Sequence, residues 1–328
     1  MRIDITYDKQ YLLLTSDYIT EINAVRNAFT CEVKNAWLLR KKSSLIETRR
    51  CFVSNHGYMP VGLWQDLLAY CKANNIYCEL SPVLIDYLNT FNNLSFDTFK
   101  NYIDKTFEGA QTPAGNPFRP YDYQIEAAWS LLKFKRSSAE ISTSGGKTII
   151  AFIIFKYLID VVGVNKILYI VPSVDLAEQS DAKFQQYESW LTVHHHNWKT
   201  GILKSGLRVA EKRKVDPANI LFGTYQSLMY KEKDFFVPFN ACILDEAHHI
   251  SASSNKKILS HCENLQYSIG FTGTYPKDNS IDSYALKSYI GPKVYTLTSD
   301  ALINEEKQAT PIYMVFTLLN WATDEEKQ

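Results

Sequence analysis

The stretch AEISTSGGKTII, residues 139–150, predicts the fold class of most of this chain. A short apolar segment runs into a loop with adjacent glycines, and a lysine, a threonine and a second apolar run follow. This order is typical of a phosphate-binding loop between a strand and a helix, because glycines let backbone N–H groups approach phosphate oxygens at the positive end of the helix. The predicted nucleotide-binding residues of the loop are Thr143, Ser144, Gly145, Gly146, Lys147 and Thr148. Lys147 would supply positive charge, and Thr148 would supply a magnesium ligand.

The loop departs from the general pattern GxxxxGK[ST] at Ile141, where that pattern has glycine. An ordinary glycine turn between a strand and a helix is therefore the alternative interpretation. Further along the chain, an apolar run ends in Leu244, Asp245 and Glu246, followed by Ala247 and His248. Two acidic residues at the end of a strand suit two separate tasks, since one carboxylate can hold Mg²⁺ while the other orients a water molecule toward a phosphate. This second motif favours the nucleotide-binding interpretation.

Apolar runs rich in β-branched residues surround these motifs. They read KILYIVP, NILFGT, ACILDEA and YSIGFTG, and longer helical patterns separate them. The runs lack the alternation of a strand with one solvent-exposed face, so each is predicted to be covered on both faces. Strands of this kind, joined by crossover helices, form a parallel doubly wound sheet. We therefore expect an α/β fold.

The segment GAQTPAGNPFRP, residues 109–120, is rich in proline and glycine and predicts a linker. We expect an N-terminal α+β domain at 1–108, a linker at 109–117 and a motor domain at 118–328. In the first of these, RIDITYD alternates like a strand, and GLWQDLLAYCKANN places Leu63, Leu67 and Cys71 at helical spacing.

Residues 118–328 resemble the first RecA-like domain of a DEAH-type superfamily 2 helicase or translocase. The resemblance rests on segments in the family order: PYDYQ, STSGGKT, VPSVDLAEQ, GTYQSL, LDEAH and TGT. It implies a P-loop fold, ATP and Mg²⁺ as cofactors, and DNA as partner. The residues that it implies are Gln124 for adenine; Lys147, Asp245, Glu246 and His248 for catalysis; Thr148 and Asp245 for the metal; Thr272, Gly273 and Thr274 for coupling; and Pro172, Ser173 and Thr224 for DNA.

The chain departs from the family pattern at two of these places. The family usually has glycine where Ser144 stands, and it often has arginine where Tyr121 stands. Either Tyr121 or Phe118 is placed to stack on the base of a nucleotide.

The net charge is zero, with 35 basic and 35 acidic residues, so charge is informative only locally. Two segments, 34–50 and 199–214, are strongly basic, and the first contains Trp37. Basic groups beside an exposed aromatic ring can bind phosphates and stack on an unpaired base. The candidate DNA contacts in these segments are Arg40, Lys41, Lys42 and Lys204. The alternative for both segments is an ordinary solvated surface.

The N-terminal segment around MPVGLWQDLLAYCKANNIYCEL resembles the accessory domain of a phage helicase that acts on branched DNA. This likeness implies an ATP-dependent motor on branched, forked or single-stranded DNA in replication, recombination or repair, with other proteins of these processes as possible partners. A DNA-binding module without its own ATPase activity, an RNA helicase and a restriction-type motor subunit remain as alternatives.

Length and composition bound these expectations. Fewer residues follow Thr274 than the ~100–150 of a further domain, so we expect the second motor lobe to be absent and hydrolysis by this chain alone to be slow or undetectable. No apolar stretch approaches the ~20 residues of a membrane span, and six cysteines in 328 residues suggest a reducing compartment. We predict a cytoplasmic protein, in the host cytoplasm if it is encoded by a phage.

Two further groups of residues suggest other chemistry. His194, His195 and His196 are adjacent, as in some metal sites, but adjacent side chains point in different directions and a solvated loop is the simpler interpretation. Asp17, Glu32 and Lys34 resemble the carboxylates and lysine of restriction-type nucleases, which we keep as an alternative function for the N-terminal domain.

Overall fold

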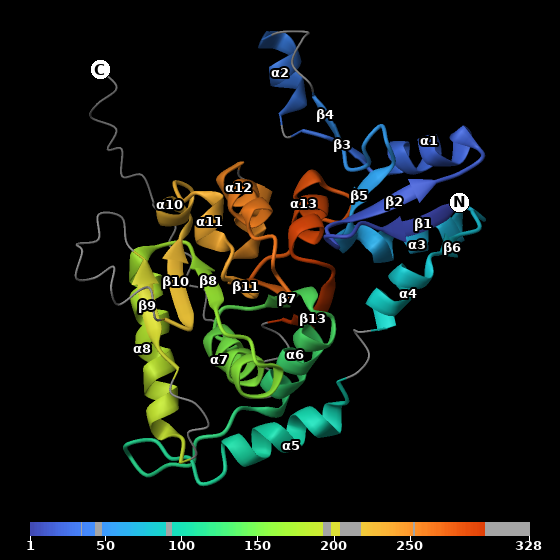
Figure 1. The fold of residues 1–328 in the computed structure, drawn as a ribbon. Helices are drawn as coiled ribbons and strands as arrows, with labels where there is room; N and C mark the ends of the chain where they lie inside the picture. Colours follow the sequence, from blue (N-terminus) through green and yellow to red (C-terminus); the bar gives the residue numbers. More distant parts are fainter. Residues whose placement is uncertain are drawn as a thin grey trace, which may run out of the picture.

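The computed structural model describes residues 1–33, 35–42, 48–89, 94–192, 198–203, 218–251 and 253–298. The described part of the motor domain is built on a seven-stranded sheet in the order β13-β7-β12-β11-β8-β10-β9 (Figure 1). Every strand pairs in parallel with its neighbours. The strands are β7 (Arg136–Ile141), β8 (Ile167–Val171), β9 (Thr200–Leu203), β10 (Ile220–Thr224), β11 (Ala241–Leu244), β12 (Tyr267–Thr272) and β13 (Lys293–Leu297). The predicted α/β fold with a parallel doubly wound sheet is confirmed.

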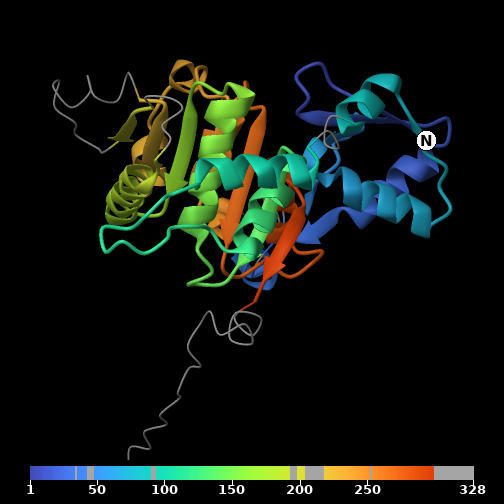
Figure 2. The same cartoon turned by 90° about the horizontal axis from the view of Figure 1, so that it is seen from below.

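Both faces of this sheet are buried, which explains the continuous apolar runs. In β8, Tyr169 and Val171 belong to one hydrophobic cluster, whereas Leu168 and Ile170 belong to another on the opposite face. Successive side chains of a strand point to opposite faces, so an apolar strand needs helices on both sides. Figure 2 shows the sheet from below, with the helices on either side of it.

The helices divide between the two faces. Those whose apolar residues join the first cluster are α5 (Phe96–Thr106), α6 (Asp122–Lys133), α7 (Lys147–Tyr157) with the π-helical turn η3 (Leu158–Val162), and α8 (Val174–Trp190). Those on the second face are α10 (Tyr225–Leu228), α11 (Lys233–Phe236), the 3₁₀ helix η4 (Ala247–Ser251), α12 (Ser253–His261) and α13 (Ile281–Tyr289).

The N-terminal domain is a small α+β unit, as predicted. Its sheet has the order β5-β2-β1-β6, in which β1 pairs antiparallel with β2 and parallel with β6. The strands are β1 (Arg2–Ile5), β2 (Tyr11–Thr15), β5 (Tyr58–Pro60) and β6 (Glu79–Leu80). The helices are α1 (Ile19–Ala28), η1 (Val61–Leu63), α3 (Trp64–Ala73) and α4 (Pro82–Asn89).

A basic arm extends from this unit. It consists of the antiparallel strands β3 (Thr30–Glu32) and β4 (Arg49–Cys51), with helix α2 (Ala36–Lys42) between them in the chain. In Figure 1, α2 stands away from the rest of the domain at the end of this ribbon.

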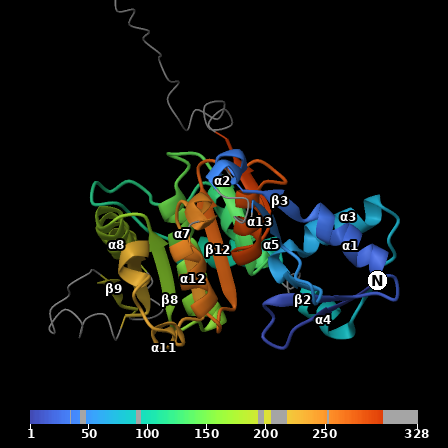
Figure 3. The same ribbon diagram turned by 90° about the horizontal axis from the view of Figure 1, so that it is seen from above.

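The N-terminal domain packs against α13 of the motor domain, and the two share one hydrophobic cluster (Figure 3). The rings of Phe29 and Phe52 lie 5.3 and 5.4 Å from the ring of Tyr284. Lys287 Nζ forms an ion pair of 2.7 Å with Asp66 Oδ1. These contacts join helix α13 to the accessory unit from several sides.

Replacing Gly62 with alanine is expected to disturb this interface. A Cβ atom at Gly62 would collide with the backbone carbonyl of Lys287. A backbone atom in a helix cannot move aside as the end of a flexible side chain could. Overpacking of this kind typically lowers the free energy of unfolding by about 1–3 kcal/mol. Urea denaturation, together with hydrogen exchange of the α13 amides, measures the effect. Lys72→Ala, at an exposed site on α3, is the control. Unchanged exchange in Gly62→Ala would contradict the close packing.

Helix α5 precedes the predicted linker in the chain but packs on the motor domain. Phe99 and Ile103 are buried in the same cluster as α6 and α7, and Tyr102 Oη donates a hydrogen bond of 2.9 Å to Asp160 Oδ2. Figure 1 shows α5 below α6 and α7. The domain boundaries at 108 and 117 stay a prediction. Helix α5 precedes both boundaries in the chain, yet its buried residues belong to the hydrophobic cluster of the motor domain.

Candidate nucleotide-binding and coupling site

The loop between β7 and α7 has the backbone of a phosphate-binding turn. Ser144 and Gly146 adopt left-handed conformations, with φ of 77° and 81°. A Cβ atom at Gly145 would lie 2.6 Å from Ile141 Cγ2, so the isoleucine fills space that this glycine leaves open. The hydroxyl of Ser142, at the foot of the loop, is buried and has no hydrogen-bond partner among the described residues. An unpaired polar group here fits a site that a polar ligand completes.

The left-handed conformation of Ser144 explains why related loops carry glycine there. A non-glycine residue in this region of φ costs roughly 1–3 kcal/mol, although glycine also has more conformational freedom to lose on folding. We expect Ser144→Gly to raise the free energy of unfolding by about 0.5–1 kcal/mol. Chemical denaturation measures the change, with Thr143→Gly in the same exposed loop as the control. A Ser144→Gly protein less stable than wild type would contradict the strain.

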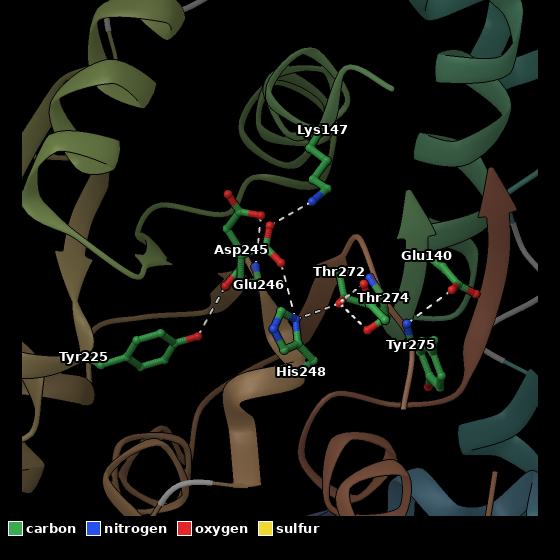
Figure 4. Close-up of polar contacts among 9 residues, drawn as sticks. All are labelled: Glu140, Lys147, Tyr225, Asp245, Glu246, His248, Thr272, Thr274 and Tyr275. Carbon is green, nitrogen blue, oxygen red and sulfur yellow. Dashed lines mark hydrogen bonds and ion pairs between the residues drawn. The ribbon is translucent and has the colours of Figure 1, made fainter. Parts of the chain in front are cut away.

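Two acidic residues face the loop from the end of β11 (Figure 4). Glu246 Oε1 lies 3.0 Å from Lys147 Nζ, and Asp245 Oδ1 accepts a hydrogen bond of 3.0 Å from the Glu246 N–H. Glu246 has a φ of 48°, a strained value of the kind that is frequent at functional sites. Burial raises the pKa of Asp245, and Lys147 opposes this shift. A carboxylate so desolvated gains most from a nearby cation.

His248 connects these carboxylates to the segment 272–274. Its Nδ1 lies 2.9 Å from Thr272 Oγ1 and 3.3 Å from Glu246 Oε2. Thr272 donates its hydroxyl proton to the Thr274 carbonyl at 2.8 Å, so it can offer Nδ1 only a lone pair. The carboxylate also only accepts. Nδ1 of His248 therefore carries a proton and donates it, which joins Glu246 to Thr272 through one ring.

The same ring is neutral near pH 7. Burial lowers the pKa of His248 from 6.5, and the neighbouring His249 acts in the same direction. Because the folded pKa is below the unfolded value, the unfolded chain binds the proton first as the pH falls below about 6.5. The His248 contribution to stability is thus lost on acidification.

Gln124 is turned inward at the start of α6. Its Oε1 accepts a hydrogen bond of 3.0 Å from the Tyr121 N–H, and its Nε2 donates one of 3.3 Å to Tyr123 Oη. The Tyr121 ring is half exposed and stacks on Tyr123, whereas Phe118 is partly buried and stacks on Tyr187 against the core. Of the two aromatic residues considered for base stacking, the structure leaves Tyr121 at the surface.

Comparisons with known proteins agree with this geometry. Residues 117–277 match the family described as "Type III restriction enzyme, res subunit". The ATP-dependent DNA helicase UvsW of Enterobacteria phage T4 is 25% identical over 257 residues, which cover 77% of this chain and 47% of that helicase. The chain resembles superfamily 2 helicases. It spans about half the length of the curated relative.

The crystal structures of UvsW show the same fold. One covers 90% of this chain and 100% of the UvsW chain, with a TM-score of 0.75 and 21% identity. A second covers 90% and 57% of the two chains, with a TM-score of 0.74 and 20% identity. The superposable part includes the accessory unit as well as the motor domain, since it extends over nine-tenths of the chain.

The helicase motifs are supported by residues that sequence patterns did not single out. Tyr225 Oη donates a hydrogen bond of 3.3 Å to the Asp245 carbonyl. Glu140, at the end of β7, accepts a hydrogen bond of 3.2 Å from the Tyr275 N–H (Figure 4). Its carboxylate also forms an ion pair of 2.9 Å with Lys293. In the sequence, the only feature that distinguishes Glu140 is its charge between two apolar residues in AEI. These contacts hold the chain segments that follow β11 and β12.

The predicted DNA contacts of the motor domain lie at the carboxyl ends of β8 and β10. Pro172 follows β8, and Ser173 caps α8 by accepting a hydrogen bond from the Leu176 N–H at 3.3 Å. Thr224 is only 3% exposed, and its hydroxyl accepts a hydrogen bond of 3.2 Å from the Ser227 N–H. Contact with DNA stays a prediction for all three, and the Thr224 hydroxyl is already used as a helix cap.

The basic arm exposes the side chains of Trp37, Arg40 and Lys41. Trp37 is exposed, and Lys41 Nζ lies 4.9 Å from the centre of its ring. Arg40 pairs with Glu32 at 2.7 Å, which engages one carboxylate of the nuclease alternative. Asp17 is exposed. Several of the named residues lie outside the described part of the chain: Lys34, Lys204 and the three adjacent histidines, His194 to His196. The side chain of Lys42 lies outside it as well.

Among the residues that the structure describes, no group of three or more His, Cys, Asp or Glu side chains could hold a metal ion on its own. A magnesium ion at Asp245 and Thr148 would thus depend on phosphate and water ligands, as Mg²⁺ commonly does. No helix in the part of the chain that the structure describes is both long and apolar enough to cross a bilayer.

Proposed function

We propose that this chain carries the first motor lobe of an ATP-dependent DNA helicase or translocase that acts on branched or forked DNA. The observation that carries the proposal is the pairing of Lys147 with Glu246 at 3.0 Å, together with the link from Glu246 through His248 to Thr272. These contacts bring a phosphate-binding loop, a pair of acidic residues and a coupling segment together. The similarity to a phage DNA helicase supports DNA as the partner.

The residues at the site fit a magnesium-bound nucleoside triphosphate. When bound, this group supplies the phosphoanhydride bond whose hydrolysis releases free energy. Lys147 Nζ and the loop N–H groups of 144–148 bind phosphate oxygens. Asp245 and Thr148 hold the metal ion. Tyr121 stacks on the base and Gln124 reads its edge.

Glu246 and His248 divide the remaining work. Glu246 accepts the proton of the attacking water at a carboxylate oxygen, once Lys147 has turned to phosphate. His248 donates from Nδ1 to both Glu246 and Thr272, so a change at the carboxylate alters the hydrogen bonding of Thr272 and Thr274. A Cβ atom at Gly273 would lie 3.5 Å from Lys147 Nζ, so this segment also passes close to the phosphate loop.

The accessory domain supplies the preference for branched DNA in this proposal. Its arm places Trp37 and Lys41 on an exposed helix beside the motor domain. An aromatic ring among basic groups suits the unpaired bases and clustered phosphates at a fork. Processes of replication, recombination or repair provide such structures inside the cell.

A binding experiment tests the proposal. The affinity of the chain for a fluorescein-labelled DNA fork, a DNA duplex and an RNA fork is measured by anisotropy, with no nucleotide, with ADP and with a non-hydrolysable ATP analogue. We expect the DNA fork to bind most tightly, and nucleotide to change its affinity by about tenfold, within the usual range of coupling between two sites.

His248→Ala should remove this nucleotide effect while ATP-analogue binding persists, and His249→Ala is the matched control. If nucleotide does not change the affinity of the wild-type chain for DNA, the result would favour a DNA-binding module without motor activity. Equal binding of the RNA fork would favour the RNA helicase alternative, and equal binding of fork and duplex would contradict the branched-DNA preference.

A further inference from the structure

A pocket of about 70 Å³ lies where the accessory domain meets the motor domain. Its walls include Gln10, Tyr11, Arg50 and Phe52 from the accessory side, and Arg136 and Tyr289 from the motor side. Arg136 begins β7 and Tyr289 ends α13, just before β13. The pocket is therefore at the amino ends of the sheet strands, whereas the phosphate loop and the proposed DNA contacts follow their carboxyl ends.

The lining of this pocket is cationic. It contains two guanidinium groups, those of Arg50 and Arg136, and no carboxylate. Arg136 Nη2 donates a hydrogen bond of 3.3 Å to Gln10 Oε1, and Arg50 lies 5.1 Å from the ring of Phe52. Among the described residues, neither arginine forms an ion pair. Two guanidinium groups without acidic partners favour an anion with several oxygens, and their planar fork matches phosphate.

The floor of the pocket strengthens this preference. Apolar side chains form it, namely Leu259, Cys262 and Leu265. Charges beside apolar surface are less screened by water than charges on an open surface, so an anion bound there interacts more strongly with the arginines.

Basic groups continue from both sides of the pocket. Lys9 precedes Gln10, and Lys135 precedes Arg136. Burial lowers the pKa of Lys135, and the charge of Lys9 lowers it further. On the other side, Arg49 precedes Arg50 in β4, which is part of the basic arm. Further basic residues thus lie next to the pocket residues in the sequence on both sides.

Aromatic rings stand at the mouth of the pocket. Tyr11 lines it and is 45% exposed, and Tyr58 on the neighbouring strand is 42% exposed. Their ring centres are 6.5 Å apart, and the ring planes are inclined by 82°. Free phosphate makes no use of an exposed ring, whereas a single strand of nucleic acid can bind phosphate at the arginines and stack a base on tyrosine.

We propose that this interdomain pocket binds a backbone phosphate of single-stranded nucleic acid, with an adjacent base stacked on Tyr11. The proposal rests on the proposed function and adds a second site for single-stranded nucleic acid to it. This site lies at the amino ends of the β-strands, whereas Pro172, Ser173 and Thr224 lie at the carboxyl ends. Arg50 and Arg136 come from different domains, so the site exists only when the two are packed together.

The test is the double variant Arg50→Gln/Arg136→Gln in the full 328-residue chain. Its affinity for a fluorescein-labelled oligo-dT is measured by anisotropy without nucleotide, over a range of NaCl concentrations. We expect a loss of about tenfold or more. The salt slope should also become shallower by about 0.7, since the double variant loses one single-strand phosphate contact and each contributes roughly 0.7. Unchanged affinity and slope would overturn the proposal.

Control variants separate a lost contact from a damaged fold. Arg50→Lys/Arg136→Lys keeps the charges and should keep the salt slope. Lys105→Gln removes an exposed charge on α5, at the other side of the motor domain, and should bind like wild type. Tyr11→Ala should weaken oligo-dT binding by about tenfold without changing the salt slope, because stacking releases no counterions. A Tyr11→Ala protein with wild-type affinity would contradict the stacking.

Two further measurements identify the occupant. An oligonucleotide containing 5-iodo-deoxyuridine should photocrosslink to Tyr11 or Tyr58 in the wild-type chain, and crosslinks confined to other peptides would overturn the proposal. Inorganic phosphate could raise the melting temperature of the wild-type chain but not that of the Arg50→Gln/Arg136→Gln variant, while both bind oligo-dT equally. In that case the pocket binds a free anion and the proposal fails. A wild-type chain that binds the oligo-dT while the double variant binds equally refutes the pocket alone. A wild-type chain that binds no nucleic acid contradicts the proposed function as well.

Discussion

Replacing Lys147 with alanine is expected to weaken the binding of Mg²⁺-ATP by roughly 100-fold, the effect of losing charged hydrogen bonds to phosphate. The lysine is the cation that the loop brings to the acidic pair, with its Nζ 3.0 Å from Glu246 Oε1. Without it, the Glu246 carboxylate stays at the site and repels the phosphates. A fluorescent ATP analogue reports the dissociation constant directly, so the measurement does not depend on the rate of hydrolysis.

The matched control is Lys277→Ala. Lys277 is exposed and follows the segment 272–274. It removes the same charge near the site without touching the loop, so we expect wild-type affinity. Far-UV circular dichroism checks the fold of both variants. Equal affinity of Lys147→Ala and wild type would contradict the nucleotide-binding assignment of the loop, and an equal loss in Lys277→Ala would reduce the effect to net charge.

A second large effect is expected at Lys156, which lies on the buried side of α7. Its side chain is only 1% exposed, and Nζ lies 3.4 Å from both Asp160 Oδ2 and Glu188 Oε2. Tyr102 of α5 donates to the same Asp160 carboxylate. Lys156→Met would leave two carboxylates in the core without their cation, and removing one partner of a buried pair typically costs about 3–5 kcal/mol. Urea denaturation should show this loss.

The triple variant Lys156→Met/Asp160→Asn/Glu188→Gln serves as the comparison. It removes the charges together, so no buried ion is left without a partner, and we expect it to recover most of the stability. Hydrogen exchange in α5 should rise in the single variant, because Tyr102 ties that helix to the network. A single variant as stable as wild type would show that water reaches these carboxylates in the folded chain.

The periodicity of the apolar runs predicted the strands of the motor domain and their burial on both faces. Tyr169 and Leu168 illustrate why, because adjacent residues in a doubly covered strand must both be apolar. The loop residues 143–148 and the acidic pair after β11 were also predictable, since each depends on the order of residues over one short segment. The N-terminal resemblance predicted an accessory α+β unit, which the structure confirms.

The partners of individual side chains were not predictable in this way. Contact of Gln124 with adenine stays a prediction, but the hydrogen bonds of its amide with Tyr121 and Tyr123 at the start of α6 could not be read from the residue type. Contact of Thr224 with DNA likewise stays a prediction, and only the structure showed that its hydroxyl caps α10. Polar side chains near helix starts compete for local N–H groups, and the outcome depends on the path of the backbone rather than on residue type.

The sequence by itself determined the chemistry that this protein can carry: a phosphate-binding loop, an acidic pair at a strand end and basic segments that suit nucleic acid. Only the tertiary structure decided which of these groups meet. Lys147 and Glu246, His248 and Thr272, and Arg50 and Arg136 are each brought together from distant parts of the chain. Local patterns encode which face of an element is apolar, whereas the angle and register at which elements pack depend on all the side chains between them. For this reason the interdomain pocket was visible only once the accessory unit was seen against α13.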